Sequence, residues 1–168
     1  MTTLYHGTNV HFDQPDLSKC DRRTDFGPGF YLTPDQENAE KFAKAAVEEN
    51  GGVATVICFD YDEKKAASLK PRCLDRADAT WLHFIMANRN EWKHVADHNL
   101  DLRYPIVKGL VADANFVKLM KKYRKDPVKC EAAVLKEFQC QKYKKYQYSF
   151  HTQEALCCLK KKRSYTCQ

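Results

Sequence analysis

The sequence lacks the features that mark secreted, membrane-spanning and disordered proteins. No N-terminal stretch joins a basic start to an apolar run, and nowhere do about 18 apolar residues follow one another. Glycine and proline are few, at six residues each, whereas 43% of the residues are hydrophobic. This composition is typical of a globular chain that buries its own core. We therefore expect a cytoplasmic protein that makes no membrane contact.

Common metal and catalytic motifs are also missing. Eight cysteines are present, but none are spaced as CxxC, and without a secretion signal we expect them to be reduced. The glycine-rich dinucleotide motif, the P-loop, HExxH and GxSxG do not occur. His94 and His98 have helical spacing but no third ligand in a recognisable pattern with them, so we expect no metal.

The 168 residues have the length of one compact domain, and no repeat or linker divides them. Strands and helices are mixed without regular βαβ alternation, which predicts an α+β fold with residues 1–168 as a single domain. Strands are predicted near 4–5 and at 30–32, 53–59, 106–111 and 146–151. Helices are predicted at 34–50, around 81–86, and at 115–123, 127–138 and 152–158.

Several helix starts carry specific signals. Thr33 is the predicted N-cap of the first helix, because Pro34 follows it at the first helical position and Gln36 lies three residues beyond it. Asp78, Asp126 and Thr152 are the predicted caps of later helices.

Two segments carry groups suited to a flat, polar ligand. The first, Tyr5-His6-Gly7-Thr8, ends a strand with an imidazole, a glycine that a planar ligand can approach closely, and a hydroxyl. The second, residues 25–33, reads Asp-Phe-Gly-Pro-Gly-Phe-Tyr-Leu-Thr and leads from a glycine turn into an aromatic strand. Taken singly, each is also typical of an ordinary turn beside a core strand.

Taken together and in this order, the two segments resemble the ADP-ribosyltransferase superfamily, in the branch with a His-Tyr-Glu triad that includes diphtheria toxin and the poly(ADP-ribose) polymerases. That branch has "HG[ST]" at a strand end, then "FGxGxY" and a helix. The sequence looks most like a small bacterial group described only as a domain of unknown function, which shares "YHGT", "DFGxGFYLT", "VAD" and "FHT". The last two stand here as Val111-Ala112-Asp113 and Phe150-His151-Thr152, so the resemblance runs from Tyr5 to about Leu159.

The resemblance implies an ADP-ribosyltransferase-like fold, in which two small, mostly antiparallel sheets hold NAD in the cleft between them and helices flank the sheets. His6, Gln147 and Tyr31 are the implied catalytic residues. His6 would bond a ribose hydroxyl, the Gly7 backbone would hold the nicotinamide carboxamide, and Tyr31 and Phe42 would grip the nicotinamide ring. The implied NAD-binding set is Tyr5, His6, Gly7, Thr8, Gly29, Phe30, Tyr31, Phe42 and Gln147.

Two positions depart from the pattern of these relatives. Gln147 stands where they carry glutamate, whose charge stabilises the ribosyl cation left by nicotinamide. Glutamine can bond the ribose 2-hydroxyl but has no charge, which favours transfer of single ADP-ribose units over polymer synthesis. Ala39 stands where relatives often have a serine that bonds the carboxamide. Either the pocket holds nicotinamide less firmly, or Thr33 or Thr24 substitutes for the serine.

A few other residues stay open between a functional and a structural role. Asp113 either positions an acceptor or caps a helix. Arg22 and Arg23 either meet the pyrophosphate of NAD or are simply solvated. His151 either lines the cleft or is satisfied by a backbone carbonyl.

The leading hypothesis is a mono-ADP-ribosyltransferase that cleaves the nicotinamide–ribose bond of its co-substrate NAD and passes ADP-ribose to a protein or nucleic acid. An NAD glycohydrolase, acting as a toxin or defence effector, would need the same site with water as acceptor. A third hypothesis is a catalytically degenerate module that binds NAD or nucleic acid. The net charge of +6, concentrated in 118–129, 142–145 and 160–163, suits such partners, although basic runs usually mark only a solvated face.

Overall fold

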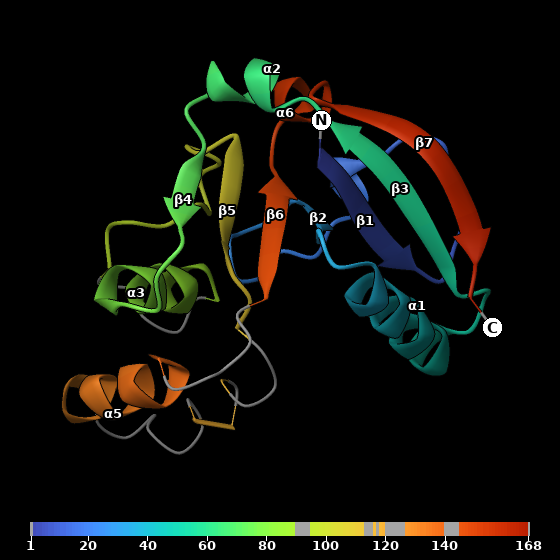
Figure 1. Cartoon of the computed structure of the whole chain (residues 1–168). Coiled ribbons are helices and arrows are strands. Elements are labelled where there is room, and N and C mark those ends of the chain that lie inside the picture. Colours follow the sequence, from blue (N-terminus) through green and yellow to red (C-terminus); the bar gives the residue numbers. More distant parts are fainter. Residues whose placement is uncertain are drawn as a thin grey trace.

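The computed structural model describes residues 2–89, 95–112, 116, 118–119, 127–139 and 145–167. Two β-sheets stand side by side with helices around them (Figure 1). The first has the order β1-β3-β7 and is antiparallel throughout. Its strands are Thr2–Thr8 (β1), Thr55–Tyr61 (β3) and Leu159–Thr166 (β7).

The second sheet has the order β2-β6-β5-β4, in which only the pairing of β4 with β5 is parallel. Its strands are Phe30–Leu32 (β2), Arg72–Leu74 (β4), Ile106–Leu110 (β5) and Tyr146–Phe150 (β6). One isolated bridge joins the sheets, where Tyr5 and Thr33 exchange backbone hydrogen bonds of 2.8 and 2.9 Å. The predicted α+β class with two mostly antiparallel sheets is therefore confirmed.

Apolar residues fill the space between the sheets because their strands alternate inward and outward side chains. Leu4, Ile57 and Phe59 from the first sheet share a buried cluster with Ile106 and Phe150 from the second. A second cluster packs helix α3 (Ala79–Asn88) and helix α5 (Pro127–Gln139) against the other face of the second sheet. Within the described residues, no helix combines the length and apolar character needed to cross a bilayer.

Helix α1 (Gln36–Asn50) lies unusually close to β1. A Cβ added at Gly7 would stand 1.9 Å from the carbonyl oxygen of Ala39, and Ala39 and Ala43 are fully buried. The glycine and the two small residues thus let the helix backbone touch the strand. The lack of a side chain at Gly7 is therefore required by the close packing of α1, and not by a ligand.

The first helix begins later than predicted. Its N-cap is Asp35, which accepts a hydrogen bond from the backbone N–H of Asn38 at 3.1 Å, so the prediction of Thr33 as cap is wrong. The reason is the bridge to Tyr5, which keeps Thr33 extended as part of the sheet. The predicted caps Asp78 and Thr152 are confirmed.

The basic run 160–163, expected to be a solvated face, forms half of strand β7. It pairs with β3, and Lys162 lies 3.3 Å from Asp60 of that strand. Lysines are common on edge strands, where they discourage pairing with other chains. Three short elements were also not predicted, namely η1 (Leu17–Lys19), α2 (Glu63–Ala67) and β4. The last helix, α6, is Gln153–Leu156. Most of the helix predicted at 115–123 lies outside the described residues, as does Asp126, the predicted cap of the following helix.

Candidate functional site

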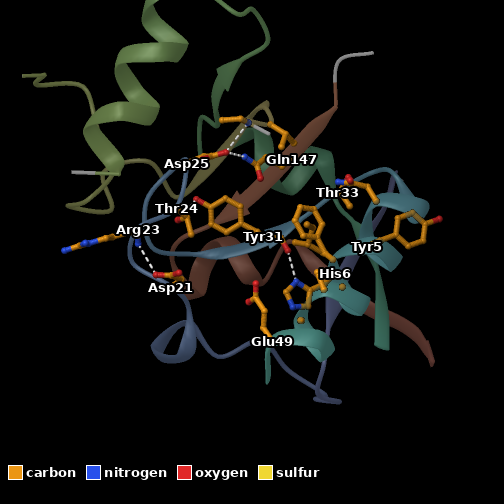
Figure 2. A pocket seen from close by; sticks show the side chains of 18 of the residues that line it. Tyr5, His6, Asp21, Arg23, Thr24, Asp25, Tyr31, Thr33, Glu49 and Gln147 are labelled. Carbon is orange, nitrogen blue, oxygen red and sulfur yellow. Dashed lines mark hydrogen bonds between the residues drawn. The ribbon is translucent and has the colours of Figure 1, made fainter. Parts of the chain in front are cut away.

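A cavity of about 730 Å³ opens where the two sheets meet. Its walls come from the end of β1, from α1, β2 and β6, and from the loop at 21–25 (Figure 2). This volume is within the range of roughly 300–1,000 Å³ that small-molecule and cofactor sites have. The three predicted catalytic residues, His6, Tyr31 and Gln147, all line it.

His6 presents one ring nitrogen to this cavity. Its Nδ1 lies 2.8 Å from the carbonyl oxygen of Tyr31, and because a carbonyl only accepts, Nδ1 must carry the proton. Burial lowers the pKa of His6, although the bond to the Tyr31 carbonyl acts in the opposite direction. The ring packs against Phe30 with centroids 4.5 Å apart. The neutral imidazole thus offers the lone pair of Nε2 as an acceptor for a hydroxyl.

Gly7 contributes its peptide groups. Successive residues of a strand point their N–H and C=O to alternate sides, and Tyr5 directs both of its groups to Thr33, away from β3. Gly7, two residues on, therefore directs its own groups to that same side. Within the described part of the chain, it makes no hydrogen bond there. A donor and an acceptor a few ångströms apart suit a primary amide.

Gln147 projects from β6 with its amide oriented by a carboxylate. Its Nε2 donates to Oδ2 of Asp25 at 2.8 Å (Figure 2). A carboxylate cannot donate, so the nitrogen must face Asp25 and Oε1 is left for the cavity. Figure 2 shows this oxygen directed away from Asp25, toward the side of the cavity where Tyr31 lies.

Tyr31 is held by its hydroxyl. That oxygen accepts from the backbone N–H of Phe26 at 2.9 Å and lies within 2.9 Å of both the Thr24 hydroxyl and the Gly27 carbonyl. Burial raises the pKa of Tyr31 far above its usual range, so the phenol stays neutral and fixed. What Tyr31 offers a ligand is therefore its ring.

Phe42 is the main apolar group that the cavity leaves in contact with water. It lies on α1, lines the cavity and is 54% exposed, which is unusual for a phenylalanine. Tyr5 also lines the cavity, but its ring packs against the buried cluster of Ala39, Ala43, Val56 and Cys58 beneath α1. Phe42 is thus the residue of this wall that a flat ligand would cover.

The predicted substitutes for the missing serine at position 39 are both occupied. Thr24 donates to the Gly27 carbonyl at 2.6 Å, and Thr33 bonds the Tyr146 carbonyl and the N–H of Asp35. Asn38, which the sequence did not single out, also lines the cavity and is only 7% exposed. Its Nδ2 is buried without a hydrogen-bond partner.

The orientation of the Asn38 amide is fixed. Its Oδ1 accepts from the Lys145 ammonium at 3.1 Å, and an ammonium only donates, so the amide cannot be turned to hide the unpaired Nδ2. A buried donor without a partner costs about 1–3 kcal/mol.

Other predicted residues lie elsewhere. Thr8 accepts from the N–H of Val10 at 3.3 Å, and Phe30 is 4% exposed inside the core between the sheets. A Cβ at Gly29 would meet the His151 ring at 2.5 Å, so this glycine makes room for a side chain. None of these three lines the cavity. Asp113 lies outside the described residues, as does His94.

Of its two predicted roles, His151 has the structural one. It is 2% exposed, donates from Nδ1 to the carbonyl of Pro28 at 2.8 Å, and has Nε2 2.7 Å from the Ser149 hydroxyl. Arg22 is exposed and does not line the cavity, whereas Arg23 does line it, with its side chain extending outward in Figure 2. The described residues contain no group of three side chains placed to hold a metal ion.

Fold and cavity together define an α+β protein whose two sheets meet at a pocket walled by aromatic rings, by polar groups such as the Gln147 amide, and by charged residues such as Asp25 and Arg89. The chain belongs to the family described as "Protein of unknown function (DUF3990)", whose model matches residues 2–161. Neither a curated protein nor a solved structure matches the chain. Because the family description names no activity, function has to be argued from the cavity itself.

Proposed function

We propose that the chain has an ADP-ribosyltransferase-like fold and is a mono-ADP-ribosyltransferase, which cleaves NAD at the nicotinamide–ribose bond and transfers ADP-ribose to a protein or nucleic acid. The observation that carries the proposal is the convergence of three groups on one cavity. They are the Nε2 of His6, the peptide of Gly7 and the Oε1 of Gln147. His6 and Gly7 lie on β1, and Gln147 lies on β6, 141 positions after His6 in the sequence.

The amide end of NAD matches the groups around Gly7. A carboxamide has one carbonyl acceptor and two N–H donors, which complement the N–H and C=O that Gly7 directs away from β3. Asn38 also lines this wall, one position before Ala39, where relatives often place a serine. The nicotinamide ring would then lie against Tyr31 and be covered by Phe42.

The ribose hydroxyls of NAD match the two acceptors. A hydroxyl of one ribose would donate to Nε2 of His6, and the 2-hydroxyl of the nicotinamide ribose would donate to Oε1 of Gln147. When the bond from the ribose carbon to nicotinamide breaks, its electron pair leaves with the ring nitrogen and the ribose becomes a cation. The acceptor then adds to that carbon and loses a proton. Negatively polarised oxygens near the cation lower the barrier to this step.

The experiment is to measure nicotinamide released from NAD by the purified protein, alone and with a cell lysate. We expect release to require Gln147 and Phe42, so Gln147→Ala should abolish turnover with NAD binding still measurable, and Phe42→Ala should weaken binding. Glu48→Ala, an exposed position on α1 that does not line the cavity, is the matched control.

The outcomes separate the hypotheses. Release that depends on lysate marks transfer, whereas equal release without lysate marks NAD hydrolysis with water as acceptor. NAD binding without any release would contradict the transferase and leave a binding module. Turnover that is unchanged in Gln147→Ala would remove Gln147 from the mechanism.

A further inference from the structure

Asp25 is a buried carboxylate whose two oxygens are both engaged. Its side chain lies beside the cavity, and the residue is 8% exposed. Oδ1 accepts from the guanidinium of Arg89, through Nε at 2.9 Å and through Nη2. Oδ2 accepts from Nε2 of Gln147 at 2.8 Å and from the N–H of Ala112 at 3.2 Å. His6, Tyr31 and Gln147 carry no charge. Asp25 is a carboxylate that is hydrogen-bonded directly to one of them, Gln147.

We propose that Asp25 is a positioning residue for Gln147, which it orients and polarises so that the neutral amide does the work of a carboxylate. The inference rests on the proposed function. Asp25 lies 122 positions from Gln147 in the sequence, and in this role it does not itself touch the ribose.

Orientation is the first part of the role. An amide side chain can present either its oxygen or its nitrogen to a ligand, and the two ends differ little in shape. The carboxylate of Asp25 accepts only, so it selects the rotamer with Nε2 inward and Oε1 toward the cavity. Without that carboxylate, part of the population would present N–H groups to the ribose cation, which would oppose its formation.

Polarisation is the second part. Hydrogen bonds in a chain strengthen one another, because donating to a negative group makes the far oxygen of the donor a better acceptor. Here the chain runs from the Arg89 guanidinium through Asp25 to the Gln147 amide and ends at the cavity. The positive group is therefore at the far end of the chain, and the end that faces the cavity is negatively polarised.

A structural role alone explains only part of this arrangement. The bonds to Arg89 and Ala112 tie the loop to the end of α3 and to the segment after β5, which would stabilise the fold without any ligand. The bond to Gln147 lies on the cavity side. A test must therefore follow activity and the Gln147 amide separately from stability.

The first variant is Asp25→Asn, which keeps the size of the side chain and removes its charge. Loss of an outer partner of a site residue typically lowers activity by roughly 10- to 100-fold. We expect that loss in kcat for nicotinamide release, with KM for NAD changed little, because orientation matters most as the cation forms. Since Arg89 would lose its buried partner, Asp25→Asn also risks poor folding, and a second variant is needed.

That second variant exchanges the two groups, as Asp25→Asn together with Gln147→Glu. It restores an amide-to-carboxylate bond with the carboxylate now at the cavity, and we expect it to regain the kcat lost in Asp25→Asn. Gln147→Glu alone should behave differently. It places two carboxyl groups within hydrogen-bonding distance beside Arg89, where they would share a proton, so its kcat should rise with pH through a range in which wild type is flat.

NMR of the Gln147 side-chain amide gives a readout without NAD. In wild type, one Nε2 proton should be shifted strongly by its bond to a carboxylate, and Asp25→Asn should remove the shift. If wild type releases no nicotinamide, the proposed function fails whatever this signal shows. If wild type is active but Asp25→Asn retains full kcat and the exchange gains nothing, Asp25 is structural only and this inference is overturned. An amide signal that is unchanged in Asp25→Asn overturns it as well.

Discussion

His6 and His151 are anchored by the same kind of hydrogen bond, and they differ in whether the second ring nitrogen has a partner. Both hold Nδ1 2.8 Å from a backbone carbonyl, that of Tyr31 for His6 and that of Pro28 for His151. Burial lowers the pKa of both, that of His151 to about 4. The Nε2 of His151 is 2.7 Å from the Ser149 hydroxyl, whereas that of His6 has no protein partner in the described part of the chain.

The comparison shows which observation separates a binding histidine from a structural one. A lowered pKa does not do so, because both residues have one. The deciding feature is an unused acceptor beside a cavity, which a core histidine would not leave unpaired.

Among changes at the two histidines and Asn38, His6→Asn should have the largest effect. Asparagine can keep the bond from the Nδ1 position to the Tyr31 carbonyl and cannot supply Nε2. Removing one hydrogen-bonding group aimed at the reacting substrate typically costs about 100-fold in rate, so we expect nicotinamide release to fall by about that factor with thermal stability nearly unchanged. Steady-state kinetics with a melting curve checks this, and a variant that turns over NAD normally would contradict the role of His6.

Acid should destabilise the protein through His151. Its folded pKa of about 4 lies below the ordinary value of 6.5, so the unfolded chain takes up a proton as pH falls between these values and the folded protein does not. Stability is thus complete above about pH 6.5 and is lost toward pH 4, by about 3 kcal/mol in full. His6 acts in the same direction. Urea unfolding at several pH values measures the slope.

His151→Asn is the counterpart of His6→Asn. It keeps the bond to the Pro28 carbonyl and leaves the Ser149 hydroxyl without its ring partner. We expect a loss of about 1–2 kcal/mol in unfolding free energy, a shallower decline in stability below pH 6.5, and turnover close to wild type. A large loss of turnover in the folded variant would show that the two histidines are not divided between binding and structure.

The smallest effect should come from Asn38→Asp. The change keeps an oxygen for Lys145 and removes the unpaired donor, so stability without NAD should be unchanged or higher. Affinity for NAD should fall by about 10-fold, because the new carboxylate in the cavity wall would repel the phosphates of NAD. Calorimetric titration and melting of the same samples measure both. A variant that is less stable and binds NAD normally would make Asn38 a structural residue.

Local patterns in the sequence were enough to predict much of the fold. Strand β2 has the predicted bounds, β6 ends one residue earlier than predicted, and Asp78 caps α3 as expected. These elements have strong apolar periodicity or a cap beside them. Strand β7 was missed because its lysines resemble a solvated run, and its strand character comes from pairing with β3. The start of α1 was shifted because a single bridge holds Thr33 in the sheet.

The site was predictable only where a motif carried it. His6, Tyr31 and Gln147 were located by resemblance and do line one cavity. Asp25 stands in the same motif as Tyr31, but its role depends on partners 64 and 122 positions away, which no local pattern reveals. Asn38 was missed for a similar reason, because an unpaired donor can be recognised only when every neighbour is known.

The most direct test of the account is NMR of the histidine ring nitrogens with and without NAD. We predict that His6 and His151 both carry their proton on Nδ1, and that NAD shifts the Nε2 signal of His6, as expected when an acceptor gains a hydroxyl donor, and leaves that of His151 in place. NAD binding that leaves His6 unchanged, or no binding at all, would contradict the claim that this cavity is an NAD site.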